Sequence, residues 1–162
     1  MYNVTGILLD TFRSTPDILN GLLRNVSQAK AAAARGGDEN PDSAGAGWSV
    51  VQVLCHLRDA EERNLERIRL MRTQDNPVLE GYDQEQWARE RNYAAAHLDE
   101  ALAAFLKRRA ATLAELASLT PQEWERPGLH SEAGPITILT YLQRLVRHDA
   151  IHLAQIARQL TE

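Results

Sequence analysis

The 162-residue sequence contains a single cysteine, Cys55, so no disulfide can form within the chain. A lone cysteine is typical of a protein in a reducing compartment, and it predicts a cytoplasmic location. Residues 1–5 lack a basic segment followed by an apolar one, which argues against secretion. No apolar run approaches the length of about 20 residues that a membrane-spanning helix needs.

An excess of positive charge is also missing. Lysine and arginine total 18 against 22 acidic residues, a net charge of −4, so no basic face for nucleic acid is expected. Hydrophobic residues make up 44% of the chain and charged residues 25%, which is ordinary for a globular protein. We therefore expect one domain over residues 1–162 that binds neither nucleic acid nor a membrane.

Internal repeats and strand patterns of useful length are lacking as well, whereas apolar residues recur at helical intervals. Residues 4–27 form the first helical segment. Thr15 suits an N-cap and Pro16 a first helical position, so a break or kink is expected between them. The alanine run 31–34 could extend this helix, and residues 29–47, rich in glycine, are predicted to form a flexible surface loop.

Capping signals define the later helix starts. Ser49 suits an N-cap and Gln52 completes a capping box, which predicts a helix to about residue 72. Asp83 is expected to cap the next helix, which runs to about residue 118. A short helix is predicted from Thr120, and Pro135 is expected to open the last helix, which ends near residue 160.

The connection between the second and third long helices is predicted to be extended, since it contains Pro77 and Gly81. Ten extended residues reach about 33 Å, and a helix over residues 50–72 is about 34 Å long. The connection can therefore return along the whole bundle and leave the two helices parallel. The sequence predicts an all-α four-helix bundle with a long crossover between helices two and three, plus a short extra helix before helix four.

Three histidines are the candidate metal ligands. His148 and His152 are four residues apart on the last helix and face one side. His56 borders the apolar face of the helix over residues 50–72. Neutral imidazole is a good ligand for zinc or nickel, and three protein ligands leave a position open for water or substrate. The same positions would also suit ordinary histidines at the edge of a core, and the spacing alone leaves both interpretations open.

Two acidic residues are candidate helpers of such a site. Asp149 falls near the apolar centre of the last helix, where a buried carboxylate needs a partner. That partner is either a ligand histidine or a helix cap or indole elsewhere in the core. Asp59 lies one turn after His56, so the candidate roles are a fourth ligand, a general base and, by default, a solvated surface acid.

Five further residues carry weaker expectations. Arg63 and Arg67 follow His56 along its helix and could steer an anionic substrate, although we expect them to form salt bridges or to be solvated. His130 is interpreted as an anchor for its loop, and His97 as a packing or surface residue. Cys55 is expected to be a small buried apolar side chain.

An ordered set of motifs extends over nearly the whole chain. It comprises Trp48-Ser49 before His56, Asp59 and Glu62; Asn76-Pro77-Val78-Leu79 before Trp87-Ala88; Trp124-Glu125-Arg126 before His130 and Gly134; and Arg147-His148-Asp149 with His152 and Gln155. This set resembles the DinB-like (YfiT-type) family of metal-dependent enzymes. The resemblance implies an up-down-down-up bundle, a divalent metal held by His56, His148 and His152, and frequently a homodimer.

The resemblance also bears on function. Some family members are transferases that join a low-molecular-weight thiol to a small electrophile, and others are described as metal-dependent hydrolases. We expect an enzyme of the thiol-transferase class with zinc or nickel, or iron as a third choice, and a small-molecule substrate. The alternatives are a hydrolase and a non-catalytic, stress-associated metal-binding bundle, while a helical interaction module with incidental histidines ranks last.

Overall fold

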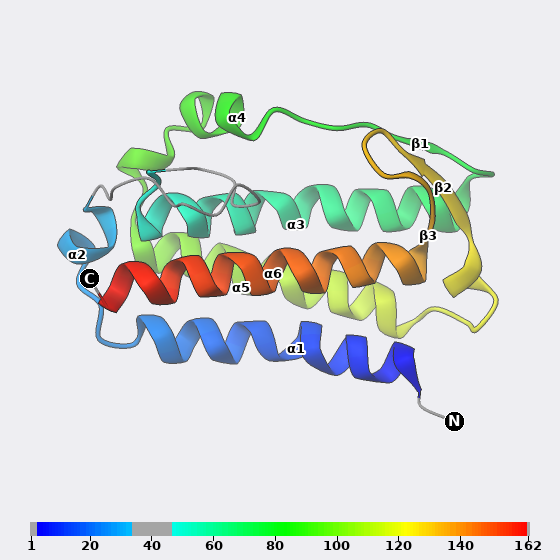
Figure 1. The fold of residues 1–162 in the computed structure, drawn as a ribbon, viewed down its shortest axis with the longest axis horizontal. Coiled ribbons are helices and arrows are strands. Elements are labelled where there is room, and N and C mark those ends of the chain that lie inside the picture. The colour runs from blue at the N-terminus through cyan, green and yellow to red at the C-terminus, as the bar shows by residue number, and fades with distance from the viewer. Residues whose placement is uncertain (1–2, 34–46, 162) are drawn as a thin grey trace.

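The computed structural model describes residues 3–33 and 47–161 (Figure 1). Its framework is four long helices: α1 (Val4–Leu23), α3 (Val50–Thr73), α5 (Leu98–Ala117) and α6 (Ile138–Thr161). Helices α3 and α5 run in one direction and α1 and α6 in the other, so the predicted four-helix bundle with up-down-down-up order is confirmed. None of the described helices is long and apolar enough to cross a membrane.

The predicted capping box at the start of α3 is confirmed. The Gln52 backbone N–H donates to Ser49 Oγ, and the Ser49 N–H donates to Gln52 Oε1. Each bond satisfies a backbone donor that the first helical turn leaves without an intrahelical acceptor. These two hydrogen bonds fix the residue at which α3 begins, and therefore the position of His56 along the bundle axis.

The predicted break at Thr15 and Pro16 is wrong, because α1 continues through both residues. Pro16 has no N–H, so the carbonyl of Phe12 loses its partner within the helix. Arg109 from α5 supplies a substitute, donating from Nη1 to the Phe12 oxygen at 3.0 Å. Thr15 does not cap a helix; its hydroxyl donates to Asp149 on α6. Contacts from two other helices therefore keep α1 intact.

The expected single helix over residues 83–118 is also wrong. The chain forms α4 (Gln84–Glu90), a 3₁₀ turn η1 (Tyr93–Ala95) and then α5. Asn92 takes a left-handed conformation with φ 49°, which prevents α4 from continuing. The Leu98 N–H donates to the Gln28 side chain, and this hydrogen bond supports the start of α5 at Leu98. The crossover over residues 74–97 thus carries β1, α4 and η1 back along the bundle (Figure 1).

A small sheet, which the sequence patterns did not predict, closes one end of the bundle. Strand β1 (Val78–Leu79) pairs in parallel with β2 (Pro127–His130), which pairs antiparallel with β3 (Gly134–Thr137). Pro135 lies in β3 and does not open α6, and the short helix expected from Thr120 is the 3₁₀ turn η2 (Glu123–Glu125). Strands of two to four residues are too short for the alternation that sequence analysis relies on.

The alanine run does not extend the first helix. Ala31 and Ala32 belong to a separate short helix, α2 (Gln28–Ala32), which Ser27 caps by accepting from the Lys30 N–H, and Ala33 ends that helix. Residues 34–46, most of the predicted flexible loop, lie outside the described residues.

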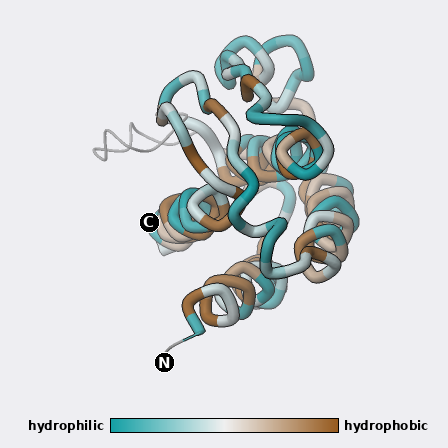
Figure 2. Tube along the Cα trace, turned by 90° about the vertical axis from the view of Figure 1, so that its right-hand side faces the viewer, coloured by the Kyte–Doolittle hydropathy of each residue, from teal (hydrophilic) through white to brown (hydrophobic). Residues whose placement is uncertain are grey.

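A polar layer divides the core into two apolar clusters. One cluster includes Leu19, Leu54, Phe105 and Ile156, and the other includes Phe12, Ile68, Leu116 and Leu142. On each long helix, buried polar residues lie between the two: Thr15, Glu61, Asn64, Arg109, Asp149 and His152. Viewed along the helices, α3 is beside α6, and α5 completes the ring with α1 (Figure 2). The histidines lie at this layer, between α3 and α6.

Candidate metal centre

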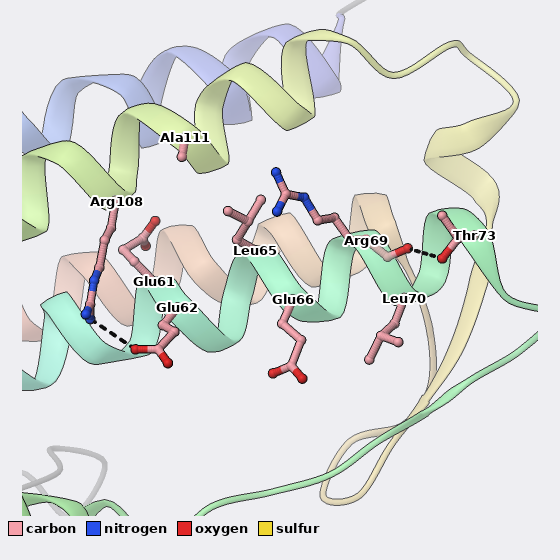
Figure 3. Close-up of a pocket in the computed structure, with 9 residues that line it drawn as sticks. All are labelled: Glu61, Glu62, Leu65, Glu66, Arg69, Leu70, Thr73, Arg108 and Ala111. Atoms are coloured by element: carbon pink, nitrogen blue, oxygen red, sulfur yellow. Dashed lines mark hydrogen bonds and ion pairs between the residues drawn. The ribbon is translucent and has the colours of Figure 1, made fainter.

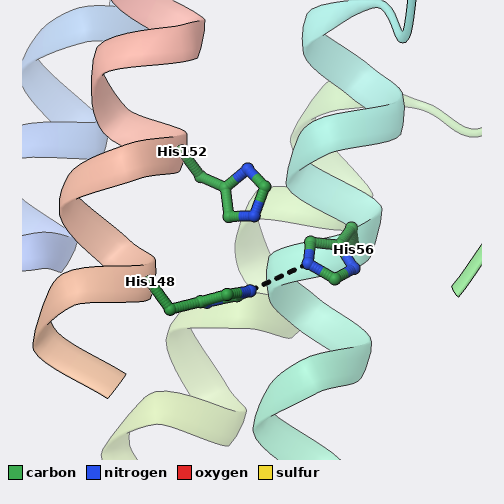
Figure 4. A group of neighbouring side chains, drawn as sticks. All are labelled: His56, His148 and His152. Carbon is green, nitrogen blue, oxygen red and sulfur yellow. Dashed lines mark hydrogen bonds between the residues drawn. The ribbon is translucent and has the colours of Figure 1, made fainter. Parts of the chain in front are cut away.

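Three histidines from two antiparallel helices meet in the polar layer. His56 comes from α3, and His148 and His152 come from adjacent turns of α6 (Figure 4). One ring nitrogen of each lies within 4.8 Å of those of the other two, and the Nε2 atoms of His56 and His148 are 2.9 Å apart. The structure thus brings together the three residues that the sequence singled out.

Burial favours the neutral form of His56 and His148. His56 and His152 are buried, and His148 is partly exposed. Burial, reinforced by the nearby His152, lowers the pKa of His56 to about 3. Burial also lowers the pKa of His148 well below its ordinary value. A neutral imidazole carries the free lone pair that a metal ion needs.

Gln155 orients one of the rings. Its Oε1 lies 2.8 Å from His152 Nδ1. An amide oxygen can only accept, so Nδ1 carries the proton and the lone pair is on Nε2. The family motif included Gln155 without assigning it a role of its own, although its position three residues after His152 on a helix was a usable signal.

The donor set fits a divalent metal. A tetrahedral zinc ion with Zn–N bonds of about 2.0–2.1 Å places its nitrogen ligands about 3.3 Å apart. The nitrogen separations here, from 2.9 Å up to 4.8 Å, bracket that value. Three imidazoles suit zinc or nickel, and they leave coordination positions free.

Two of the three clustered histidines, His56 and His148, border a cleft of about 440 Å³. Its walls come from α3, α6, the crossover near Tyr82 and the β2–β3 turn. His56 and His148 line it together with Asn64, Arg67 and Tyr141. This volume is in the range of small-molecule sites, so a ligand in the cleft would lie against the histidine cluster.

The sequence model of the DinB superfamily matches residues 11–156 of the chain. The chain belongs to the DinB superfamily. This match covers both helices that carry the histidines, and it confirms the family that the sequence motifs indicated.

Several relatives carry names that refer to a metal. A candidate metal-dependent hydrolase of Oceanobacillus iheyensis is 34% identical over 111 residues, and the candidate metal-dependent hydrolase YfiT of Bacillus subtilis is 30% identical over 111 residues. Each alignment covers 68% of this chain but only 63% and 62% of the relatives, so the chain spans less than two thirds of their length. A candidate metal-dependent hydrolase of Geobacillus thermodenitrificans is 31% identical over 142 residues, covering 83% of this chain and 78% of that protein.

Two solved structures share the fold. YfiT from Bacillus subtilis, described as a four-helix bundle of unusual topology, matches with a TM-score of 0.83 and 22% identity over 98% of this chain and 87% of its own. TT2238, a four-helix bundle protein, matches with a TM-score of 0.65 and 23% identity over 94% and 97%. At these identities the two structures support the fold of this DinB-superfamily chain.

Asp59 of this DinB-superfamily chain is not the solvated surface acid that was its default interpretation. The residue is 1% exposed, and its carboxylate accepts hydrogen bonds from Arg58, Tyr93 and Arg108 and lies 3.0 Å from Arg91 Nη1. Burial alone would raise its pKa, but the hydrogen bonds from Arg58 and Tyr93 outweigh it and lower the pKa to about 2. Asp59 therefore ties α3 to α5 and the crossover, and it is not part of the histidine cluster.

Asp149 has neither of its expected partners. Its two carboxylate oxygens accept from Arg109 at 2.7 and 2.9 Å, and one of them also accepts from Thr15. Burial raises its pKa, and Arg109 opposes that shift. Successive side chains on a helix point about 100° apart, so Asp149 faces α1 and α5 while His148 faces α3.

The other candidate residues lie outside the histidine cluster. His130 anchors the β2–β3 turn as predicted, accepting at Nδ1 from the backbone N–H groups of Glu132 and Ala133. His97 is exposed at the start of α5, and Cys55 is buried. Arg63 pairs with Glu66. Arg67 is neither salt-bridged to a described residue nor solvated, since it is 7% exposed.

A second hollow of about 470 Å³ lies between α3 and α5 (Figure 3). Its lining mixes apolar side chains such as Leu65 and Leu70 with opposed charges, of which Arg108 and Glu62 are 3.4 Å apart. Within the described part of the chain, the potential metal-ligating cluster lies at the other cleft. That cleft is therefore the candidate functional site.

Proposed function

We propose that this protein is a metal-dependent enzyme in which His56, His148 and His152 hold one divalent ion at the wall of the 440 Å³ cleft. The observation that carries the proposal is the convergence of three imidazoles beside a cavity of small-molecule size. Zinc or nickel is the proposed ion, with iron(II) third, because neutral nitrogen donors suit all three. The names of the relatives, which refer to metal-dependent hydrolases, support a catalytic rather than a storage role.

The residues around the three histidines have separate proposed roles. The bound ion would act as a Lewis acid that lowers the pKa of a coordinated water or thiol. Gln155 holds His152 in the tautomer that presents Nε2. The Trp48 ring, 5.5 Å from the His56 ring, shields the buried side of the cluster from water. On the open side, the amide of Asn64 and the guanidinium of Arg67 are polar groups that line the cleft.

The finer proposal is transfer of a low-molecular-weight thiol to a small electrophile, as the family resemblance implies. The thiolate sulfur forms a bond to the electrophilic carbon, the leaving group departs with its bonding electrons, and the thiol proton passes to solvent. Cys55 cannot supply the sulfur, because it is buried and burial raises its pKa to about 11. The thiol must therefore be a separate cosubstrate. Hydrolysis is the second candidate, supported by the relatives' names.

The first experiment is elemental analysis of untagged protein. We expect about one metal per chain in the wild type and none in His56→Ala or His148→Ala, because three nitrogen ligands are needed for tight binding. His97→Ala is the matched control, since His97 is exposed and lies outside the cluster, and it should keep its metal. Absence of metal in the wild type, even after reconstitution with zinc or nickel, would overturn the proposal.

Turnover then separates the reaction classes. Thiol consumption with a halogenated electrophile, lost in His152→Ala, would support the transferase. Ester or amide cleavage without added thiol, lost in the same variant, would support the hydrolase. A protein that retains its metal but turns over neither substrate class would be a metal-binding bundle without catalysis.

A homodimer is the proposed assembly, and α1 offers a surface for it. Ile7 and Ile18 are 55% and 44% exposed and lie eleven residues apart, so they face the same side of the helix. Light scattering on the wild type should give twice the chain mass, and Ile7→Glu with Ile18→Glu should give the monomer. A monomeric wild type would exclude the dimer.

A further inference from the structure

The side chain of Arg67 has unused hydrogen-bonding capacity at the cleft. It lines the cleft, yet the residue is 7% exposed. Its Nη1 donates to the Tyr141 hydroxyl at 3.2 Å and its Nη2 to the backbone oxygen of Glu80, while Nε has no partner among the described residues. A guanidinium has five N–H donors, so most of them are left over.

The positive charge of Arg67 also lacks a direct counter-ion. Within the described part of the chain, no carboxylate lies at ion-pair distance. Arg109, buried to a similar depth on α5, shows the usual arrangement, since it contacts both Glu61 at 2.9 Å and Asp149 at 2.7 Å. Burial of a guanidinium without a paired anion is unfavourable, so the site is suited to an anion supplied from outside.

A chain of hydrogen bonds fixes the position of this guanidinium. The Tyr141 hydroxyl accepts from Arg67 and donates to Asn64 Oδ1, and Asn64 Nδ2 donates to Glu61 Oε1. Two neutral side chains therefore separate Arg67 from the nearest carboxylate in the network. The network orients Arg67 and leaves its charge unneutralised at the cleft wall.

We propose that Arg67 binds an oxyanion of the substrate, a carboxylate or a phosphate. The planar fork of a guanidinium matches such groups with two parallel hydrogen bonds. The acids that line the cleft, Asp83, Glu85 and Glu132, are exposed, and their charges are screened by solvent. Arg144, also exposed, adds a second cation to the lining.

The spacing along α3 sets the shape of the substrate. Arg67 follows His56 by eleven residues, which is about 16 Å along the helix axis and close to three turns, so both face the cleft. The substrate is therefore elongated, with its oxyanion at Arg67 and its reacting group at the histidines. This inference rests on the proposed function for the identity of the cleft as the substrate site.

The test observes the Nε–H signal of Arg67 by NMR in protein labelled with ¹⁵N-arginine. The titrants are hexanoate, its uncharged isostere hexanamide, and inorganic phosphate. We expect hexanoate or phosphate to shift the Arg67 signal and hexanamide to leave it unmoved. The larger response identifies the oxyanion as a carboxylate or a phosphate. If neither anion moves the signal, the inference is overturned.

Variants add a second readout by calorimetry. Arg67→Gln should bind hexanoate or phosphate at least tenfold more weakly, and Arg67→Lys, which keeps the charge without the fork, should fall between it and the wild type. Arg69→Gln is the matched control, since Arg69 lies on the same helix, pairs with Glu115 and is absent from the cleft lining. Wild-type affinity in Arg67→Gln would contradict the inference, as would an equal loss in Arg69→Gln.

The same titrations in zinc-loaded wild type and in His152→Ala separate this inference from the proposed function. Anion binding at Arg67 with no metal binding would overturn the metalloenzyme proposal and keep the oxyanion site. Metal binding with no response at Arg67 would overturn the oxyanion site and keep the metal centre.

Discussion

Replacing Gln155 with leucine should weaken metal binding while leaving all three histidines in place. Leucine is of similar size but cannot accept a hydrogen bond, so His152 Nδ1 loses its partner at 2.8 Å. The ring then loses this restraint on its tautomer, and a proton placed on Nε2 removes the lone pair from the site. Loss of such an outer partner weakens metal binding about 10- to 100-fold, which is about 1.4–2.7 kcal/mol.

The assay is competition for zinc between the protein and a chromophoric chelator at neutral pH. Gln155→Glu retains an acceptor and should keep near-wild-type affinity. Gln159→Leu is the buried control: Gln159 lies one turn further along α6, and its Nε2 donates to the Trp48 carbonyl, not to a histidine. Wild-type zinc affinity in Gln155→Leu would refute the role assigned to this hydrogen bond, as would an equal loss in Gln159→Leu.

Three further predictions concern stability, each measured by urea unfolding. The folded-state pKa of Asp59, about 2, is below its ordinary value of 3.8, so the Asp59 carboxylate stabilises the fold above about pH 4, and about 2 kcal/mol of the free energy of unfolding is lost as the pH falls to 2. Asp59→Asn should reduce this pH dependence, and an acid-unfolding profile identical to that of the wild type would contradict the prediction. A Cβ at Gly128 would lie 2.8 Å from Met71 Cγ, so Gly128→Ala should lower the free energy of unfolding by about 1–3 kcal/mol. Gly21 lies in open space within α1, so Gly21→Ala should raise it by about 0.5–1 kcal/mol. Equal effects of the two substitutions would refute the steric argument. Phe105→Ala, in the buried core, should cost about 3–5 kcal/mol, and a loss below about 1 kcal/mol would show that the site collapses.

Part of the candidate site could be predicted from the sequence. The spacing of His148 and His152 placed them on one face of a helix, and the family motifs added His56. Gln155 could have been found in the same way, because it follows His152 on that helix. For Arg67 the sequence raised an anion-steering role but favoured salt bridging or solvation, since the pattern of charges along α3 does not tell whether a carboxylate from another helix will meet it. Arg109 meets two such carboxylates and Arg67 meets none among the described residues.

Local interactions are what the sequence by itself determined. The capping box of Ser49 and Gln52 and the Asp83 cap involve residues three apart, and both form as predicted. The length of the connection was enough to predict parallel second and third helices, even though the crossover proved longer and contains its own helix.

Tertiary structure decided the rest, through contacts between residues far apart in the chain. Helix α1 passes through Pro16 because Arg109, from α5, satisfies the Phe12 carbonyl. Asp59 is buried because arginines from α5 and the crossover reach it. Short-range patterns located the starts of α3 and α4, whereas the start of α5 and the pairing of buried charges depend on which helices pack side by side, and only the assembled bundle specifies that.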